Sequence, residues 1–337
     1  MATLLEVLIQ ASEKAASIAR SCCLEENEHL LVAEKCERDA NARFDKDFKT
    51  IADVLAQESA KTEIATRYPE LAQHVRGEEC SEIGGVSIKL EENVVKTAEI
   101  LSGLVPLKVA ERMAAAAHND VDILLHDLPK ELPPIDIADL GVWIDPIDAT
   151  AEFIAGVRGE ADADHGLPCV TVLIGAFRRS TGEPVIGVIN QPFFRGNKGR
   201  ILWGISYEDY KAWGCSDKDI HTNTNTVLMS GAENQDIIEK VKKSGWEVMS
   251  LPGAGNKLMK VALGEAAMYI VSKGTTFRWD TCAPHAILRA KGGDLITYTN
   301  KSPITYNVPE SDNMQTYCNS GGIIAYTNPE FFEKFLK

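Results

Sequence analysis

Two apolar, β-branched segments lie in the middle of the chain, separated by a four-residue turn. Residues 169–179 read CVTVLIGAFRR and residues 184–193 read PVIGVINQPF, with Ser-Thr-Gly-Glu between them. β-Branched residues favour strands, and a short turn containing glycine joins antiparallel neighbours. The pair therefore predicts a β-hairpin, and residues 201–207 predict a further strand. The first part of the chain is expected to be α+β, with a largely antiparallel sheet.

The second part of the chain has a different pattern, in which short β-rich segments alternate with amphipathic segments of helical period. This alternation predicts an α/β layer. The predicted strands are 226–230, 247–251, 267–271, 295–298 and 321–326, and the predicted helices are 233–243, 256–263, 281–290 and 329–337. The Gly/Asn/Arg stretch at 195–199 marks the expected division, which gives an α+β half over 1–195 and an α/β half over 196–337.

The N-terminal region is predicted to be mostly helical. Apolar residues from Leu4 to Val32 recur with a helical period, and a second helix is expected from Asp47 to Thr66. Thr50 would cap a turn there, with Asp53 three residues later. Further helices are expected at 94–101 and 107–117, a turn into a short strand at 84–92, and a strand within 138–148 that stops at Pro146.

Charge and composition exclude several classes of partner. The net charge of −14 over 337 residues argues against nucleic acid and anionic membrane surfaces. The longest apolar runs, such as 167–177, are too short to span a bilayer, and Met1 opens directly into an amphipathic pattern. We therefore expect a cytoplasmic protein of about two domains, and the sequence makes no obligate protein partner evident.

The cysteines and histidines do not predict a metal or disulfide framework. The eight cysteines are scattered without a CxxC pair, and the seven histidines form no group with ligand spacing. Neither a disulfide-stabilised fold nor a zinc site is expected. Each histidine is expected to have a buried or a surface role instead.

The segment WIDPIDATAEFIAG, residues 143–156, places two aspartates on either side of a proline at the start of a predicted helix. Asp145 and Asp148 would repel each other, and more strongly if the loop is buried. A hard cation such as Mg²⁺ between them would remove the repulsion, since it prefers oxygen ligands and keeps positions open for water and phosphate. The free N–H groups at the helix start would bind an anion.

Three other acidic stretches stand out, with Asp53, with Glu78 and Glu79, and with Asp280, which like Asp145 and Asp148 lies at a junction before a predicted helix. Taken singly, each is more often a helix cap or a solvated surface residue. Taken together with the Asp-Pro-Ile-Asp segment, they predict a magnesium site. Two ions about 3.5–4 Å apart can hold the attacking and leaving oxygens of a phosphoryl transfer. Such ions would also offset the repulsion between an acidic protein and an anionic substrate.

A glycine-containing loop is the candidate for substrate recognition. In LPGAGNKLMKVALGEA, residues 251–266, Gly253, Ala254 and Gly255 precede a predicted helix that carries Lys257 in its first turn. Free N–H groups, small residues and a cation together form an anion-binding arrangement. An ordinary tight loop with a surface lysine is the alternative on these residues alone.

Three motifs resemble those of the lithium-sensitive, magnesium-dependent superfamily that contains inositol monophosphatase and fructose-1,6-bisphosphatase. They are Glu78-Glu79, DPIDAT at 145–150 and WDTCAPHAILRAKGG at 279–293. The resemblance extends over nearly the whole chain and includes FKTIADVLAQE at 48–58. The chain departs from the family pattern at Ala149, where serine or glycine is common, and 203–226 and 295–321 look shorter than in the vertebrate enzymes.

The resemblance implies a fold, an activity and a set of metal ligands. The fold would be a layered αβαβα sandwich with its site between the two halves. The activity would be hydrolysis of the 1-phosphate of inositol 1,4-bisphosphate and inositol 1,3,4-trisphosphate. Two or three Mg²⁺ would bind, with inhibition by Li⁺ and Ca²⁺. Glu78, Asp145 and the Ile147 carbonyl would hold one ion, Asp53, Asp145, Asp148 and Asp280 would share the second, and Glu79 belongs to the same set.

The resemblance also implies roles in catalysis and substrate binding. Thr150, with Asp53 or Glu78 as its carboxylate partner, would orient and deprotonate the attacking water. The residues expected to contact substrate are Asp148, Ala149, Thr150, Ser230, Gly253, Ala254, Lys257 and Asp280.

Alternative functions on the same scaffold are a 3′(2′),5′-bisphosphate nucleotidase, an inositol monophosphatase and a non-catalytic inositol-phosphate-binding regulator. The loop at 253–257 favours a substrate with a second phosphate, which disfavours the monophosphatase but not the nucleotidase. A non-catalytic regulator would be expected to lack a metal ligand or Thr150. All of the predicted metal ligands and Thr150 are present, which disfavours the regulator.

Overall fold

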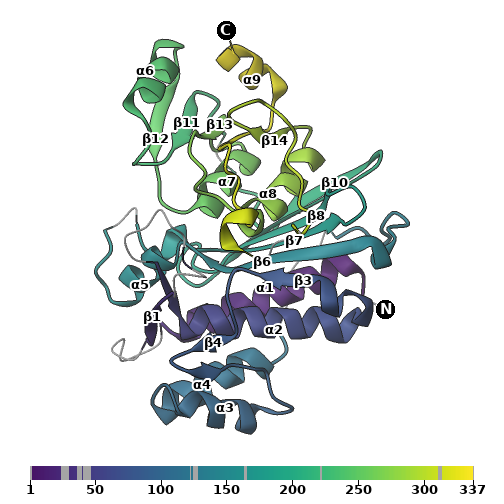
Figure 1. The fold of residues 1–337 in the computed structure, drawn as a ribbon, viewed down its shortest axis with the longest axis vertical. Helices are drawn as coiled ribbons and strands as arrows, with labels where there is room; N and C mark the ends of the chain where they lie inside the picture. Colours follow the sequence, from purple (N-terminus) through teal and green to yellow (C-terminus); the bar gives the residue numbers. More distant parts are fainter. Residues whose placement is uncertain are drawn as a thin grey trace.

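The computed structural model describes residues 2–23, 30–35, 40, 47–121, 123, 128–162, 165–220, 222–309 and 313–336. Over these ranges the chain forms alternating layers of helices and sheets (Figure 1). Helices α1 and α2 cover one face of a six-stranded sheet, α7 and α8 lie between this sheet and a five-stranded sheet, and α6 and α9 cover the outer face of the second sheet. This is the αβαβα sandwich that the family resemblance implied.

The first helical layer begins with capped helices. Thr3 and Glu6 form a capping box at the start of α1, Leu4–Ser21. Thr50 caps α2, Ile51–Arg67: its hydroxyl accepts from the N–H groups of Ala52 and Asp53, and Asp53 Oδ2 accepts from Thr50 N at 2.7 Å. The predicted cap is confirmed, and it fixes Asp53 at the start of a buried helix.

Two boundary predictions in this region were wrong. The helix expected to reach Val32 ends at Ser21, and Val32–Glu34 instead form β1. The helix expected from Asp47 begins at Ile51, because Phe48–Thr50 form β2, which pairs antiparallel with β1. Residues 24–29 lie outside the described residues.

The six-stranded sheet has the order β10-β9-β8-β7-β6-β3, and only the β3–β6 pair is parallel. The predicted hairpin is confirmed as β7 and β8. The expected end of a strand at Pro146 was wrong, since β6 continues to Asp148 through a register shift between Asp145 and Asp148. The strands are β3 Val75–Gly77, β6 Leu140–Asp148, β7 Thr171–Arg178, β8 Pro184–Gln191, β9 Arg200–Tyr207 and β10 Tyr210–Cys215.

The five-stranded sheet has the order β12-β11-β13-β15-β14, with parallel pairs around β11 and antiparallel pairs around β15. Its alternation with helices agrees with the sequence pattern. The elements are β11 Thr226–Met229, α6 Gln235–Lys243, β12 Glu247–Ser250, α7 Ala254–Leu263, β13 Met268–Val271, α8 Arg278–Ala290, β14 Asp294–Thr297, β15 Ile323–Tyr326 and α9 Pro329–Leu336. The first sheet continues past residue 195 to Cys215, and the division of the chain near residue 195 stays a prediction.

Smaller elements complete the described chain. The helical hairpin of α3, Val94–Ser102, and α4, Leu107–His118, lies beyond the first helical layer (Figure 1). The short strands β4, Glu82–Ile83, and β5, Val86–Ser87, pair with each other, and α5, Thr150–Val157, follows β6. Across the part of the chain that the structure describes, none of the helices has the length and apolar character needed to cross a membrane.

Glycines in three neighbouring strands allow α8 to lie directly on the first sheet. A Cβ atom at Gly175 would stand 2.5 Å from Ala283 N, one at Gly187 would stand 2.0 Å from Ala283 O, and one at Gly204 would stand 2.8 Å from Ile287 Cα. Such distances are shorter than atoms tolerate, so each strand needs glycine under the helix. This close approach brings the start of α8 to the edge of the sheet where β6 ends.

Candidate active site

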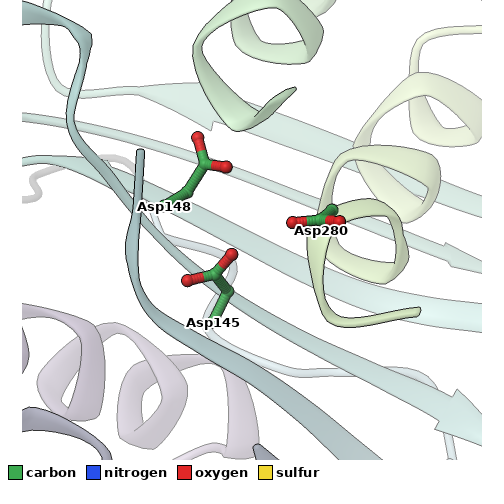
Figure 2. Close-up of side chains that lie close together, drawn as sticks. All are labelled: Asp145, Asp148 and Asp280. Atoms are coloured by element: carbon green, nitrogen blue, oxygen red, sulfur yellow. The ribbon is translucent and has the colours of Figure 1, made fainter. Parts of the chain in front are cut away.

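Three aspartates from two distant segments form an acidic triad. Asp145 and Asp148 come from the end of β6 and Asp280 from the first turn of α8, and their carboxylates face a common space (Figure 2). One oxygen of each lies within 4.8 Å of the others, and all three side chains are buried. Asp145 Oδ1 has no hydrogen-bond partner among the described residues. The structure thus brings together the three aspartates that the sequence singled out at junctions.

The electrostatics of the triad favour a bound cation. Burial, reinforced by the charges of Glu78 and the other triad members, raises the pKa values of Asp145 and Asp280 well above their usual range. Burial also raises the pKa of Asp148 to about 6. Three buried carboxylates are costly when ionised, and the Lys257 charge only partly opposes the rise in the pKa of Asp148. Oxygen ligands, burial and an unpaired oxygen together fit a hard divalent cation such as Mg²⁺.

Local backbone geometry sets the positions of these carboxylates. The register shift in β6 lets Asp145 and Asp148 turn toward the same space although they are three residues apart. Ala149 then adopts the left-handed conformation, with φ 71° and ψ 49°, which ends the strand and begins α5. Asp280 is held by its own helix start, where Oδ2 accepts from Phe277 N at 2.5 Å.

The glycine loop contacts the triad directly. Asp148 Oδ2 accepts from Gly255 N at 2.9 Å and from Thr171 Oγ1 at 3.2 Å. A Cβ atom at Gly253, which has φ of +76°, would stand 3.1 Å from the same oxygen. Ala254 is the first residue of α7. The loop predicted to bind substrate and the acidic triad therefore lie in direct contact.

Thr150 lies at the start of α5, between the triad and Asp53. Its Oγ1 is 3.2 Å from Asp53 Oδ1 and 3.2 Å from the Ile147 carbonyl, so its proton can go to either acceptor. Burial raises the pKa of Asp53 to about 6, although the two bonds from Thr50 oppose the rise. The structure brings Thr150 to the carboxylate that the sequence analysis offered as one of its two partners.

Glu78 and Glu79 occupy a different arrangement from the triad. Among the described residues their nearest cation is Lys35, whose Nζ is 2.5 Å from Glu78 Oε1 and 2.7 Å from Glu79 Oε1. Burial lowers the pKa of Lys35, but the charges of both glutamates outweigh that effect and hold it well above its usual value. Burial raises the pKa of Glu79 to about 8. Lys35 follows β1, and nothing in the sequence pattern pointed to it.

Gln57 of α2 fixes the main chain of the glutamate pair. Its Oε1 accepts from Glu79 N at 2.9 Å, and its Nε2 donates to the Glu79 carbonyl at 2.5 Å. A Cβ atom at Gly77 would stand 1.8 Å from Gln57 Oε1, so glycine is needed at this close approach. The Glu78 charge adds to the rise that burial causes in the pKa values of all three triad aspartates, so Glu78 acts electrostatically on the triad.

Lys257 is buried beneath the loop, with a residue exposure of 4%. Its Nζ donates to the Leu251 carbonyl at 2.8 Å and to the Gly253 carbonyl at 2.6 Å. Burial lowers its pKa to about 8, against the attraction of Asp148. The alternative of a surface lysine is therefore wrong. Ser230 follows β11, and its hydroxyl accepts from Ala232 N at 3.3 Å, as a turn residue does.

Comparison with known proteins decides the family. A model of the inositol monophosphatase family matches residues 1–337. The chain belongs to the inositol monophosphatase family. As a member of this family, it is a phosphatase.

Relatives in this family include inositol polyphosphate 1-phosphatases. The mouse protein is 35% identical over 382 aligned residues, which cover 100% of this chain and 96% of the relative, and the human protein is 36% identical over 391, with the same coverage. A rat 3′(2′),5′-bisphosphate nucleotidase 1 is 29% identical over 289 residues, which cover 83% of this chain and 79% of the relative.

Solved structures share the fold of this chain. The extragenic suppressor protein SuhB from Bartonella henselae superposes with a TM-score of 0.60 at 16% identity, over 99% of this chain and 98% of its own. An inositol monophosphatase from Thermotoga maritima gives a TM-score of 0.57 at 15% identity, over 98% of this chain and 96% of its own. At these identities the likeness supports the layered fold alone.

Proposed function

We propose that this phosphatase removes the 1-phosphate from inositol 1,4-bisphosphate and inositol 1,3,4-trisphosphate in a reaction that requires Mg²⁺. The observation that carries the proposal is the buried acidic triad, joined by one hydrogen bond from Gly255 to a loop suited to phosphate. The full-length similarity to inositol polyphosphate 1-phosphatases supports the choice of substrate.

The triad would form the centre of the cation site. Asp145, Asp148 and Asp280 would hold Mg²⁺ directly, and the unpaired Asp145 Oδ1 is free to do so. The remaining predicted ligands are Asp53, Glu78, Glu79 and the Ile147 carbonyl, which would complete a site for two or three ions. Bound Mg²⁺ would supply Lewis-acid activation of water and stabilise charge on the phosphoryl oxygens. For Glu78 and Glu79 to take part, Lys35 must give up its contacts with them.

Thr150 and Asp53 would prepare the nucleophile. The Thr150 hydroxyl donates to Asp53, so its oxygen lone pairs can accept a proton from a water molecule next to the triad. Asp53 is held by two bonds from Thr50, which fixes the direction of this acceptor. The water would then be oriented toward phosphorus, and the proton would pass through the hydroxyl to the carboxylate.

Two helix starts would hold the phosphates. The first N–H groups of α5, at Ala149 and Thr150, would donate to the phosphate that is cleaved. The first turn of α7 would face a phosphate that is not cleaved, beside Gly253 and Ala254. Lys257 has three N–H donors, and two of them are used by loop carbonyls. The third donor would reach the second phosphate, and Ser230 is proposed as a further contact.

The proposed setting is a cytoplasmic enzyme of small-molecule metabolism. The net charge of −14 does not favour nucleic acid or anionic membranes, and nothing in the chain calls for an obligate protein partner. Substrate anions would be attracted locally by the bound cations, which offset the acidic surroundings.

A phosphate-release assay over four substrates tests the proposal. Inositol 1,4-bisphosphate and inositol 1,3,4-trisphosphate should be hydrolysed faster than inositol 1-phosphate and adenosine 3′,5′-bisphosphate, and only with Mg²⁺ present. Ca²⁺ in excess and millimolar Li⁺ should both lower the rate, since Ca²⁺ takes more ligands at longer distances. Preference for the adenosine bisphosphate would make the enzyme a nucleotidase, and full activity in chelator would reject the metal mechanism.

A further inference from the structure

A chain of hydrogen bonds connects β6 to α8 through Tyr306. The indole Nε1 of Trp143 donates to the Tyr306 carbonyl at 2.9 Å. The Tyr306 hydroxyl lies 2.9 Å from His285 Nδ1, and His285 Nε2 lies 2.7 Å from Asp294 Oδ1. Trp143, Tyr306 and His285 are buried, with exposures of 1%, 0% and 3%. Nothing in the proposed chemistry uses these side chains.

The chemistry of the four groups sets the direction of each bond. An ionised carboxylate only accepts, so Asp294 requires the proton to be on His285 Nε2. Burial lowers the pKa of His285, so the ring is neutral and its Nδ1 is an acceptor. The Tyr306 hydroxyl therefore donates to Nδ1. Every donor and acceptor named in this series of hydrogen bonds has a partner. Removing one of these side chains would leave its neighbour with a buried donor or acceptor that lacks a partner.

The hydrogen-bond chain includes one residue from each of the two elements that carry Asp145 and Asp280. Trp143 is two residues before Asp145, so the two side chains leave β6 on the same face. His285 is five residues after Asp280 on α8, a rise of about 7.5 Å along the helix. Pro284 lies between them and has no N–H, so the Asp280 carbonyl lacks its usual partner within the helix. The turn that carries Asp280 therefore depends more on contacts made just beyond Pro284.

We propose that Tyr306 and His285 are positioning residues for the cation site, because they fix α8 against β6 and so set the spacing between Asp280 and Asp145. This inference rests on the proposed function, which assigns both aspartates to Mg²⁺. Neither residue touches the cation or the substrate. Their effect would be on the affinity for Mg²⁺, since coordination requires its ligands at nearly fixed separation.

The substitution Tyr306→Phe removes one hydroxyl and keeps the ring. We expect Mg²⁺ binding to the free protein, measured by isothermal titration calorimetry, to weaken about 5- to 10-fold. This is less than the roughly 10- to 100-fold typical of residues bonded directly to a metal ligand, because Tyr306 acts through His285. The rise in Tm caused by a fixed Mg²⁺ concentration should shrink accordingly. At saturating Mg²⁺ the kcat should stay within about twofold of the unsubstituted enzyme.

Tyr68→Phe is the matched control. Tyr68 follows α2 in the first helical layer, and its hydroxyl donates to the Ala2 carbonyl at 3.0 Å, so this variant also loses one hydroxyl hydrogen bond but should bind Mg²⁺ normally. If Tyr306→Phe does not fold, Asp294→Asn is the alternative variant. It removes the charge of the half-exposed carboxylate that accepts from His285, and it should weaken Mg²⁺ binding about 2- to 3-fold.

The outcomes separate this inference from the proposed function. An unchanged Mg²⁺ affinity in a folded Tyr306→Phe protein, with only a lower Tm, would show a purely structural role and overturn the inference. The same holds for Asp294→Asn if it is the variant that folds. An unsubstituted protein that binds no Mg²⁺ would instead overturn the proposed function, and this inference with it.

Discussion

Asp148 Oδ2 accepts a hydrogen bond at 2.9 Å from the backbone N–H of Gly255, which lies 107 residues later in the chain. This bond joins the end of β6 to the first turn of α7. A carboxylate proposed to bind the cation is thereby held by the loop proposed to bind the substrate. A change in the loop should therefore alter both functions of the site.

Gly255→Ala should damage the site at this contact. The added Cβ would stand 2.3 Å from Thr171 Oγ1 and 3.0 Å from Asp148 Oδ2, so α7 or Asp148 must move. We expect a loss of about 2 kcal/mol in the free energy of unfolding, together with at least a tenfold fall in kcat/KM. Gly103→Ala is the control. Gly103 caps the end of α3 in a right-handed conformation, and a Cβ atom there would stand 3.4 Å from the nearest atom, the Ile100 carbonyl oxygen. Equal behaviour of the two variants would contradict the assignment of the loop.

Thr150→Ala should lower kcat by about 10²- to 10³-fold, because the hydroxyl is proposed to orient and accept a proton from the nucleophile. The free energy of unfolding should change by no more than about 1 kcal/mol, since Thr150 Oγ1 makes only bonds of 3.2 Å. Thr150→Ser keeps the hydroxyl and should recover most of the rate. Near-normal turnover in the alanine variant would reduce Thr150 to a residue that stabilises the start of α5.

Lys257→Ala should separate binding from chemistry. A charge-assisted bond to a phosphate that is not cleaved contributes about 1.5–3 kcal/mol, so kcat/KM for inositol 1,4-bisphosphate should fall about 10- to 100-fold, mostly through KM. The fall should be smaller for inositol 1-phosphate. Lys260→Ala removes a lysine one turn later, paired with Glu265 at 3.1 Å, and serves as the control.

The two carbonyl bonds of Lys257 offer another role, in which the lysine only holds the loop in shape. In that case Lys257→Ala would reduce kcat/KM by the same factor on both inositol phosphates. Such a result would remove the second-phosphate assignment while leaving the triad untouched.

Stability should depend on pH and Mg²⁺ together. The pKa values of Asp53 and Asp148 rise to about 6, and that of Glu79 to about 8, all chiefly through burial. An acid with a raised folded-state pKa binds more protons when folded, so its ionisation destabilises the fold as pH rises from about 4, its unfolded value, to its folded value. Metal-free protein should therefore lose stability between about pH 4 and pH 8.

Mg²⁺ should offset this loss by pairing with the ionised carboxylates. The difference in Tm between protein with Mg²⁺ and protein with chelator should be larger at pH 8 than at pH 5. Because other titrating groups act equally on both samples, the difference isolates the site. A difference that does not change with pH would show that Mg²⁺ binds away from these carboxylates.

The sequence predicted the acidic residues of the site better than the residues and backbone geometry that hold them in place. Asp145, Asp148 and Asp280 were recognisable because they stand in the DPIDAT and WDTCAPHAILRAKGG motifs together with further acidic residues, whereas each alone would predict a helix cap or a surface residue. Lys35 could not be predicted, since its pairing with Glu78 depends on how β1 lies against a distant loop. Proline usually ends a strand, and Pro146 does not because the register shift takes it out of the ladder.

The close approach of α8 to the first sheet also leaves a signal in the sequence. One glycine stands in the middle of each of three apolar strands, at Gly175, Gly187 and Gly204, and this pattern indicates a close backbone approach. The helix that makes the approach could not be identified from the strands alone. Strand β10 was missed because it is an edge strand whose side chains, such as Trp213, are only partly buried, so its apolar signal is weak.

The most direct test of the central claim is to follow inositol 1,4-bisphosphate by ³¹P NMR during incubation with the enzyme and Mg²⁺. The account predicts that the 1-phosphate signal disappears, that inositol 4-phosphate and inorganic phosphate accumulate in equal amounts, and that chelator stops the reaction. Loss of the 4-phosphate, or release of phosphate that continues in chelator, would contradict it.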